Sequence, residues 1–323
     1  MMENLKIVFF GTPVFAVASL RNLVMLGHHV AAVVTAPDKP AGRGLKPKPS
    51  PVKGFAETMN IPVLQPANLK DPAFLDQLWS FCPDLQIVIA FRMLPRQVWS
   101  LPPLGTFNLH ASLLPQYRGA APINRAIMNG ETETGITTFF LNDQIDTGKI
   151  ILAQKYQIRP EDTAGTMHDR LMVAGAGLVA ETVDLIRSGR LSGTPQETLV
   201  TDSQNLKPAP KIFKEDCRID WNRDTVSVFN FIRGLSPHPG AFTSFTGSDG
   251  NTYDMKILRA IPELFSHNYK QGLFLKDGKS QLIVTLPDGR LRIDELQLQG
   301  RKVMNTGDFM RGYGHLFSEM QDI

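Results

Sequence analysis

The sequence predicts an α/β domain built on a doubly wound, mostly parallel sheet, followed by a second, smaller β-barrel domain. Short apolar runs that alternate with helical patterns predict the first domain. A polar connector, and then several short strands separated by turns, predict the second. The length of 323 residues fits two domains, because single domains usually hold about 100 to 200 residues.

The first domain begins with an apolar run, LKIVFF at residues 5–10, which predicts a strand that ends at the turn Gly11–Pro13. A helical pattern follows this turn. Further strands are expected at residues 30–35, 85–90, 107–109, 135–141 and 149–157. Residues 163–188 predict one long helix with Thr163 as its N-cap, and we place the end of the first domain there, at residues 1–188.

The connector is rich in Ser, Thr, Gln, Pro and Gly and shows no apolar periodicity, so we interpret residues 189–206 as a linker on the surface. The second domain then covers residues 207–323. Its expected strands are 240–245, 253–258, 281–286 and 291–298. Trp221, Phe229 and Phe231 are expected to belong to its core rather than to a base-stacking surface.

Composition excludes several classes of protein. The net charge of +3 is too small to indicate a nucleic-acid binder by itself, so any such contact depends on a few placed cations. Cys82 and Cys217 lie far apart and predict reduced thiols. The seven histidines lack metal-ligand spacing, so we expect no metal. Without a long apolar stretch or a secretory signal, we expect a cytoplasmic protein.

The most informative stretch is GTFNLHASLLPQYRGAAP at residues 105–122. Asn108 and His110 are two residues apart in a predicted strand, so both side chains lie on one face, at the carboxyl end where α/β sheets bind ligands. Asp146 lies in a later turn-rich loop that can approach His110 across neighbouring strands. An amide, an imidazole and a carboxylate suit acyl transfer to an external amine, without an acyl-enzyme. The Asn-x-His pair alone can also be structural.

The runs NLHASLLPQYRGAAPI and NDQIDTGKI resemble the formyltetrahydrofolate-dependent formyltransferases. The resemblance covers essentially the whole chain and includes FGTPVFAVASL, APDKPAGRGLKPKPSPVK, APKIFKEDCRIDW and FIRGLSPHPGAF. The last two runs resemble the members of the family that act on tRNA. The resemblance implies a Rossmann-like catalytic domain for formyl-folate and an OB-like barrel that helps to bind tRNA. Two positions depart from the family pattern: Arg125, where many members have an aromatic residue, and Phe91-Arg92, where many have Tyr-Gly.

The resemblance also implies an activity, which is transfer of the formyl group of 10-formyltetrahydrofolate to the α-amino group of methionyl initiator tRNA by a monomer. Matching the family motif residue by residue assigns three sets. Asn108, His110 and Asp146 are expected to be catalytic. Contact with folate is expected from Ser112, Leu113, Leu114, Pro115 and Asp143. Contact with tRNA is expected from Lys39, Arg43, Lys46, Lys48 and Lys211.

Other interpretations stay open from the sequence. On composition alone, the basic residues of the 38–53 loop can be a solvated surface run. A similar catalytic domain formylates amino sugar nucleotides, and a noncatalytic tRNA-binding protein can retain this fold. A nicotinamide site is not favoured, because GxGxxG is absent after the first strand and Pro13 explains the turn.

Overall fold

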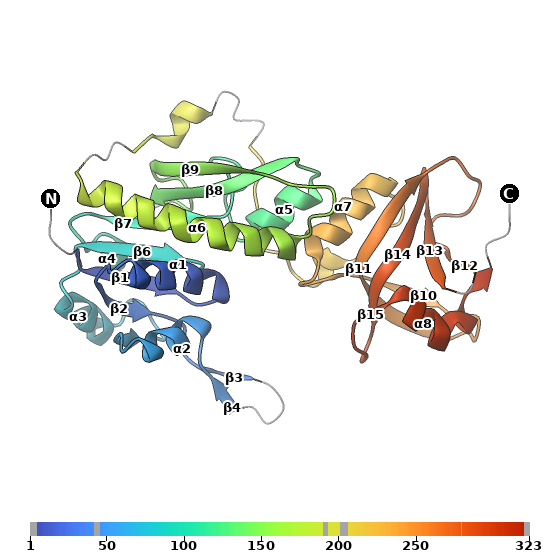
Figure 1. Cartoon of the computed structure of the whole chain (residues 1–323), viewed down its shortest axis with the longest axis horizontal. Helices are drawn as coiled ribbons and strands as arrows, with labels where there is room; N and C mark the ends of the chain where they lie inside the picture. Colours follow the sequence, from blue (N-terminus) through green and yellow to red (C-terminus); the bar gives the residue numbers. More distant parts are fainter. Residues whose placement is uncertain (1–4, 42–45, 190–192, 201–205, 279, 320–323) are drawn as a thin grey trace. The chain divides into compact units, whose positions relative to one another are not determined.

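The computed structural model describes residues 5–41, 46–189, 193–200, 206–278 and 280–319 (Figure 1). The chain divides into two compact units. The first comprises Met1–Pro122, Thr134–Gln157 and His168–Ala209, and the second comprises Ile123–Glu133, Ile158–Met167 and Pro210–Ile323. The second unit therefore includes two short segments that come from the first half of the sequence.

The first unit is built on a sheet whose described strands run in the order β5-β2-β1-β6-β7-β8-β9. The strands are β1 (Ile7–Gly11), β2 (Val30–Val34), β5 (Val63–Leu64), β6 (Leu85–Ile89), β7 (Thr106–His110), β8 (Glu133–Phe140) and β9 (Ile150–Gln157). Strands β5, β2, β1, β6 and β7 are parallel, whereas β8 is antiparallel to β7. The predicted mostly parallel sheet is confirmed.

Helices cover both faces of this sheet (Figure 1). Helices α1 (Val14–Met25), α2 (Pro51–Thr58) and α6 (Ala164–Arg187) lie on one face, and α3 (Pro72–Ser80) and α4 (Arg96–Trp99) lie on the other. Asn22 of α1 donates a hydrogen bond of 2.8 Å to the Ala176 carbonyl of α6. Phe74 of α3 packs in a core cluster with Val8 and Val34 of the sheet. Because both faces are covered, every residue of β1 and β6 is buried, as the apolar runs predict.

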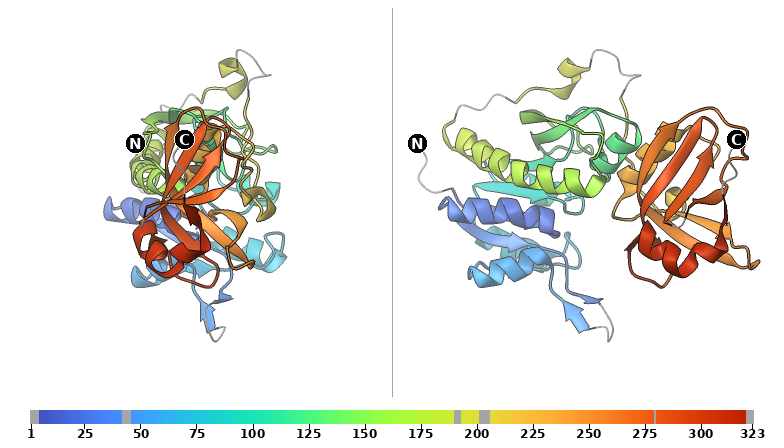
Figure 2. Two further views of the ribbon diagram at one scale, coloured as in Figure 1. Left: turned by 90° about the vertical axis from the view of Figure 1, so that its right-hand side faces the viewer. Right: turned by 45° about the vertical axis from the view of Figure 1, so that its right-hand side comes forward.

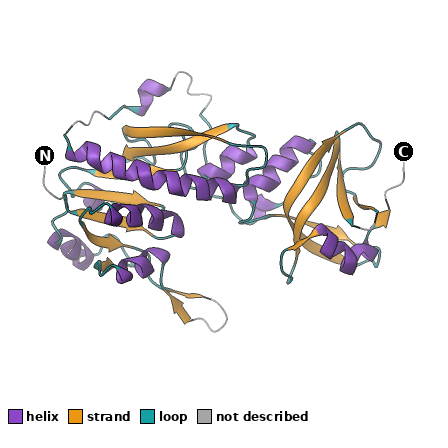
Figure 3. Cartoon of the chain, in the orientation of Figure 1, coloured by secondary structure: helices purple, strands orange, loops and turns teal. Residues whose placement is uncertain are grey.

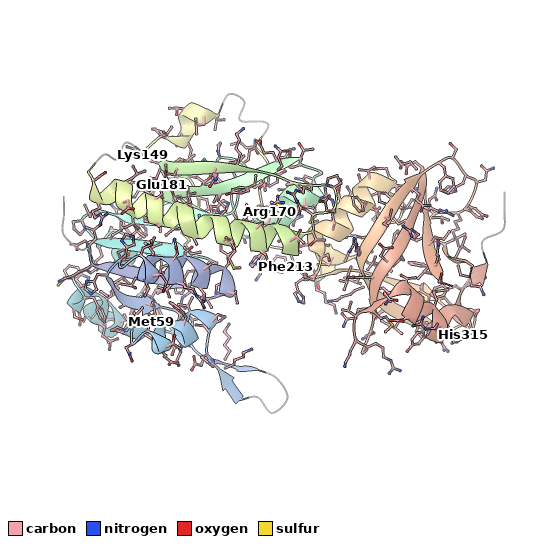
Figure 4. The ribbon with its side chains drawn as sticks, in the orientation of Figure 1. Met59, Lys149, Arg170, Glu181, Phe213 and His315 are labelled. Atoms are coloured by element: carbon pink, nitrogen blue, oxygen red, sulfur yellow. The ribbon has the colours of Figure 1, made fainter. Side chains whose placement is uncertain are left out.

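The long helix α6 begins where the sequence predicts. Thr163 accepts a hydrogen bond at its hydroxyl from the Thr166 amide, at 3.2 Å, and so caps the helix. Its side away from the sheet is exposed, as at Glu181 (Figure 4). Nowhere in the described ranges is a helix both long and apolar enough for a membrane crossing.

The second unit contains a curved, mostly antiparallel sheet (Figures 2 and 3). Its described strands run in the order β10-β11-β14-β13-β12-β16, with β15 on β14. They are β10 (Ala241–Thr246), β11 (Thr252–Leu264), β12 (Phe274–Asp277), β13 (Gln281–Leu286), β14 (Gly289–Leu298), β15 (Met304–Asn305) and β16 (Ser318–Glu319). The unit's helical elements are α5 (Pro122–Met128), α7 (Thr225–Leu235), α8 (Thr306–Tyr313) and the short turns Glu215–Cys217 and Gly314–Leu316. The predicted second β domain is confirmed.

An apolar cluster fills the second unit between its sheet and α7. Phe231 belongs to this cluster, and Trp221 and Phe229 pack against it. The prediction that these aromatic residues form core is therefore confirmed. Trp221 meets Phe274 edge to face, with ring centroids 5.6 Å apart.

A buried arginine joins the distant segments of the second unit. Arg233 of α7 is 9% exposed, and its Nε donates to the Asn230 side chain at 2.8 Å. Its Nη1 donates to the carbonyls of Asp162, at 3.0 Å, and Arg159, at 3.3 Å. Burial lowers the pKa of the Arg233 guanidinium from its ordinary value, and the Asp162 carboxylate opposes that shift. The segment 158–167 is thereby fixed to α7.

We expect Arg233→Met to lower the free energy of unfolding of the second unit by about 2 to 3 kcal/mol, because methionine fills the volume but leaves several buried acceptors unpaired. Urea unfolding measures this free energy. It is followed by Trp221 fluorescence in a chain with Trp79 and Trp99 changed to Phe, so that the signal comes from the second unit. Arg259→Met is the matched control, since the Arg259 side chain is 63% exposed in a surface ion pair. If both variants lowered the free energy of unfolding equally, the proposed contribution of the Arg233 hydrogen bonds would be contradicted.

Candidate active site

Strand β7 presents Asn108 and His110 on one face of the first unit's sheet. Leu109, between them, points to the opposite face, where it packs against Gly175 of α6 so closely that a Cβ there would lie 2.6 Å from the leucine side chain. Asn108 is the register partner of Val88, which belongs to the core cluster beneath α3 and α4. The predicted pair therefore faces the α3/α4 side, at the carboxyl end of the parallel strands.

His110 and Asp146 are brought together by the neighbouring strands β7 and β8. The His110 Nδ1 lies 3.8 Å from the Asp146 Oδ2, and the two side chains are 8% and 17% exposed. The other ring nitrogen, Nε2, lies 2.8 Å from the Tyr117 carbonyl oxygen. Because a carbonyl can only accept, Nε2 carries a hydrogen and Nδ1 is the nitrogen left to exchange a proton. The separation from Asp146 is longer than a hydrogen bond but short enough for an ion pair when the ring is protonated.

Three consecutive residues, Tyr117–Gly119, contact both members of this pair, and we call them the holding segment. The Tyr117 carbonyl accepts from His110, and the Gly119 amide donates to the Asp146 Oδ2 at 2.9 Å. The imidazole and the carboxylate are thus fixed by one short piece of backbone. Their separation depends on the conformation of that piece.

Residues 207–209 hold the holding segment in place within the first unit. The Tyr117 amide donates to the Lys207 carbonyl at 2.7 Å, and the Ala209 amide donates to the Arg118 carbonyl at 2.8 Å. Gly119 has φ of 128°, and a Cβ there would lie 2.3 Å from the Ala209 oxygen. Only glycine fits this approach.

Asp146 lies in the loop between β8 and β9, residues 141–149, which we call the Asp146 loop. The side chain of Asn142 accepts from the Gln144 amide and from the Thr147 hydroxyl, both at 3.0 Å, and so closes the loop's first turn. Asp146 itself has φ of 53°, in the left-handed region. A Cβ on Gly148 would lie 1.6 Å from the Phe140 oxygen, so this position requires glycine.

One residue of the site was missed by sequence reasoning. Gln196 is fully buried, with 0% exposure, and its Nε2 donates to the carbonyls of Asp146, at 2.9 Å, and Gly148, at 2.8 Å. It begins the short helical turn Gln196–Leu199, inside the segment predicted to be a surface linker. No local pattern marks it, because a single Gln in a polar run is typical of exposed connectors.

Residues 112–115, expected to contact folate, form a turn that is bonded to β8. The Ser112 hydroxyl donates to the Gln116 carbonyl at 2.6 Å. Thr137 of β8 donates to the Ser112 carbonyl and accepts from the Leu114 amide. Ser112 and Leu114 are buried, whereas Leu113 and Pro115 are half-buried. The polar atoms of Ser112 thus hold the turn together.

A cavity of about 570 Å³ lies on the same unit, between residues 67–70 and residues 92–97. Arg92, one of the departures from the family pattern, forms part of its wall: its guanidinium donates to the carbonyls of Pro66 and Ala67. Arg96, in the same 92–97 segment, lies 3.9 Å from Asp143 of the Asp146 loop. The cavity and the loop are therefore neighbours, and Arg92 has a structural role.

The residues expected to contact tRNA lie on several elements. Strands β3 (Lys39–Ala41) and β4 (Lys46–Lys48) pair as a hairpin in which Lys39 is opposite Lys48, and both side chains are exposed. Arg43 lies outside the described residues. Lys211 belongs to the second unit, where its ammonium lies 5.2 Å from the centre of the exposed Phe213 ring (Figure 4).

Within the described part of the chain, no group of three or more His, Cys, Asp or Glu side chains is arranged to bind a metal. In the same part, the Asn108 side-chain amide is half-buried and has no hydrogen-bond partner. An amide donor, an imidazole and a carboxylate therefore meet at one strand end. This set can stabilise a carbonyl oxygen that gains negative charge and move a proton beside it.

Comparison with known proteins gives matches over most of the chain. The formyl transferase family model matches residues 5–183, and the model of the formyl transferase C-terminal domain matches residues 211–314. The methionyl-tRNA formyltransferase of Parabacteroides distasonis is 53% identical over 312 residues, which cover 96% of each chain. That of Porphyromonas gingivalis is 48% identical over 320 residues, which cover 98% of each chain.

Two solved structures share the fold at lower identity. HypX from Aquifex aeolicus, in complex with tetrahydrofolic acid, superposes with a TM-score of 0.64 at 18% identity, over 99% of this chain and 50% of its own. WlaRD, a sugar 3N-formyl transferase, gives 0.63 at 20% identity, over 93% of this chain and 100% of its own. From the two family models and the nearly full-length relatives, the chain belongs to the formyl transferase family.

Proposed function

We propose that the chain transfers the formyl group of 10-formyltetrahydrofolate to the α-amino group of methionyl initiator tRNA, and so supports the initiation of translation. The chemistry rests on one observation: His110 lies 3.8 Å from Asp146, at the strand end that also carries Asn108. The choice of acceptor is supported by relatives named methionyl-tRNA formyltransferase, whose similarity extends through the second unit.

The reaction forms a bond between the amine nitrogen and the formyl carbon and breaks the bond between that carbon and the folate nitrogen. The departing folate nitrogen gains a proton from the His110 ring, and the proton that the amine gives up returns that ring to its charged form. The Asn108 amide and the protonated His110 ring stabilise the formyl oxygen while it carries negative charge. His110 then supplies a proton from Nδ1, the nitrogen that faces Asp146, and the carboxylate stabilises the charged ring before that transfer.

The folate donor is proposed to bind in the cavity beside the Asp146 loop. Its volume of about 570 Å³ lies within the range of small-molecule sites. Met93 and Leu94 give the wall apolar surface, and Lys70 and Arg96 give it positive charge suited to the carboxylates of a folate. Residues 112–115 and Asp143 are proposed to contact the donor where the cavity meets the loop.

The tRNA is proposed to contact the β3–β4 hairpin and Lys211. Like charges opposite each other on paired strands repel, so Lys39 and Lys48 favour a bound polyanion between them. Asp38 does not neutralise this pair, because Lys53 forms a 2.6 Å ion pair with it and lowers the pKa of the Asp38 carboxyl. Arg43 and Lys46 are also proposed to contact tRNA.

The function is tested by incubating the full chain with 10-formyltetrahydrofolate and methionyl initiator tRNA, methionyl elongator tRNA or an amino sugar nucleotide. We expect formyl-methionine on the initiator tRNA and little product on the other two acceptors. Product on the sugar nucleotide alone would reassign the acceptor. No product on any of them would refute the proposed activity.

We expect Asp146→Asn to reduce kcat by about two to four orders of magnitude, because the variant removes the charge beside His110 yet keeps an oxygen that can accept from the Gly119 amide. His110→Ala and Asn108→Ala should give losses of the same order. Gln144→Ala is the control, since Gln144 is exposed in the same loop and its bonds there use its backbone. Single-turnover formylation rates within threefold of the unchanged chain for Asp146→Asn would contradict its assignment.

Changing both hairpin lysines to glutamine, Lys39→Gln with Lys48→Gln, should weaken tRNA binding and reduce the slope of log affinity against log salt by about 1 to 2. Binding of the folate donor should not change. Filter binding over a salt series measures the slope, and Lys149→Gln with Lys302→Gln removes the same charge from other exposed positions. A slope that matches this control would show that the hairpin does not contact tRNA.

A further inference from the structure

Residues 193–200, which follow α6, are bound to the sheet of the first unit. Thr194 exchanges two backbone hydrogen bonds with Ile150 at the start of β9, each of 2.8 Å. This bridge fixes the chain two residues before Gln196. The Gln196 side chain is thereby directed into the Asp146 loop from the edge of the sheet.

The Gln196 amide makes every hydrogen bond that an amide can make. Its oxygen accepts from the Arg118 Nε, at 3.1 Å, and Nη2, at 2.6 Å. Its nitrogen donates to the Asp146 and Gly148 carbonyls. A guanidinium can only donate and a carbonyl can only accept, so these partners fix which end of the amide faces the loop. A fully bonded buried amide of this kind has one orientation.

These contacts determine the backbone of Asp146. The left-handed conformation costs a non-glycine residue about 1 kcal/mol or more, and Asp146 adopts it at φ of 53°. The Gln196 nitrogen bonds the carbonyls on both sides of Thr147, so it holds the turn in which this conformation occurs. Without that nitrogen, two carbonyls lose their donor and the turn loses the partner that offsets its strain.

The holding segment acts on both ends of Asp146, through the Arg118 side chain and through the Gly119 backbone amide. The guanidinium of Arg118, in the middle of the holding segment, donates to the Gln196 side-chain amide. The nitrogen of that amide donates to the Asp146 carbonyl. Gly119, the next residue, donates to the Asp146 carboxylate. The position of the carboxylate relative to His110 is thus set by a ring of hydrogen bonds. They link Arg118 to Gln196, Gln196 to Asp146, and Asp146 to Gly119.

We propose that Gln196 is a positioning residue for the formyl transfer, an inference that rests on the proposed function. The hydrogen bonds of Gln196 reach neither His110 nor the reacting atoms, so Gln196 acts through Asp146. Its effect is on the rate of the chemical step, because a carboxylate displaced from His110 stabilises the charged ring less. Gln196 bonds none of the residues proposed to bind tRNA or the folate donor, so binding of both should change far less than the rate of the chemical step.

The test uses two variants of the full chain. Gln196→Met keeps the length of the side chain and removes all of its hydrogen bonds, whereas Gln196→Glu keeps an acceptor for Arg118 and removes both donors to the loop. We expect each to lower kcat by about 10- to 100-fold, since a displacement of about 1 Å can reduce catalysis that far. The KM values for both substrates should stay within about twofold of those of the unchanged chain.

A double-mutant cycle separates positioning from general destabilisation. In the Asp146→Asn background, Gln196→Met should change kcat by less than about twofold, because the group it positions is already altered. Thr182→Val is the matched control: Thr182 is buried in the same unit and bonded to Thr138 and Leu178, so its loss removes buried hydrogen bonds without altering the loop. This control should lower Tm and leave kcat unchanged.

Hydrogen exchange gives a readout that does not depend on activity. In Gln196→Met and Gln196→Glu, the amides of residues 142–148 should exchange faster than in the unchanged chain, while those of β1 and β6 should not. If the unchanged chain formylates tRNA but both variants retain its kcat, the positioning role fails and the proposed function stands. Additive losses in the double-mutant cycle would also overturn the positioning role. If the unchanged chain forms no product, the proposed function and the positioning role fail together.

Discussion

The site depends on the backbone of Tyr117–Gly119, which bonds an imidazole with its first carbonyl and a carboxylate with its last amide. Because both groups attach to the same short segment, their separation is insensitive to small movements of the sheet. The segment needs support of its own, and it receives this from the bridge between Gly119 and Ala209. A chain portion about 90 residues away in sequence therefore takes part in placing the catalytic pair.

Because the catalytic pair is buried, its polar atoms need hydrogen-bond partners within the protein. The His110 and Asp146 side chains are almost shielded from solvent, and a polar group left unpaired in such surroundings costs about 1 to 3 kcal/mol. These partners are uncharged. A peptide carbonyl bonds His110, a peptide amide bonds the Asp146 carboxylate, and the Gln196 amide bonds the Asp146 carbonyl. The carboxylate can then act on the imidazole with no competing cation bonded to it in the described residues.

The sheet and the shared face of Asn108 and His110 could be predicted because their signals are local, whereas the catalytic place of Asp146, on a loop after the antiparallel strand β8, was assigned from the family resemblance. A strand shows its apolar run, a two-residue spacing fixes a shared face, and the carboxyl ends of parallel strands share an edge. The role of Gln196 could not, since its partners lie 50 and 78 residues away and no periodicity encodes such bonds. The role of Arg233 could not be predicted for the same reason, because its acceptors are 71 and 74 residues away in sequence. The β3–β4 hairpin was missed because its strands are three residues long and contain proline.

The second unit is assembled from three separate stretches of chain, and this affects how the protein can be made and divided. Residues 123–133 and 158–167 leave the ribosome well before the remainder of their unit, so they must wait for residues 210–323 before they can pack. A fragment beginning after the connector would lack the carbonyls that Arg233 bonds and the loop at Gly130 that packs on Asn230. The barrel is therefore not a detachable module, and exchanging it between relatives would require three grafts instead of one.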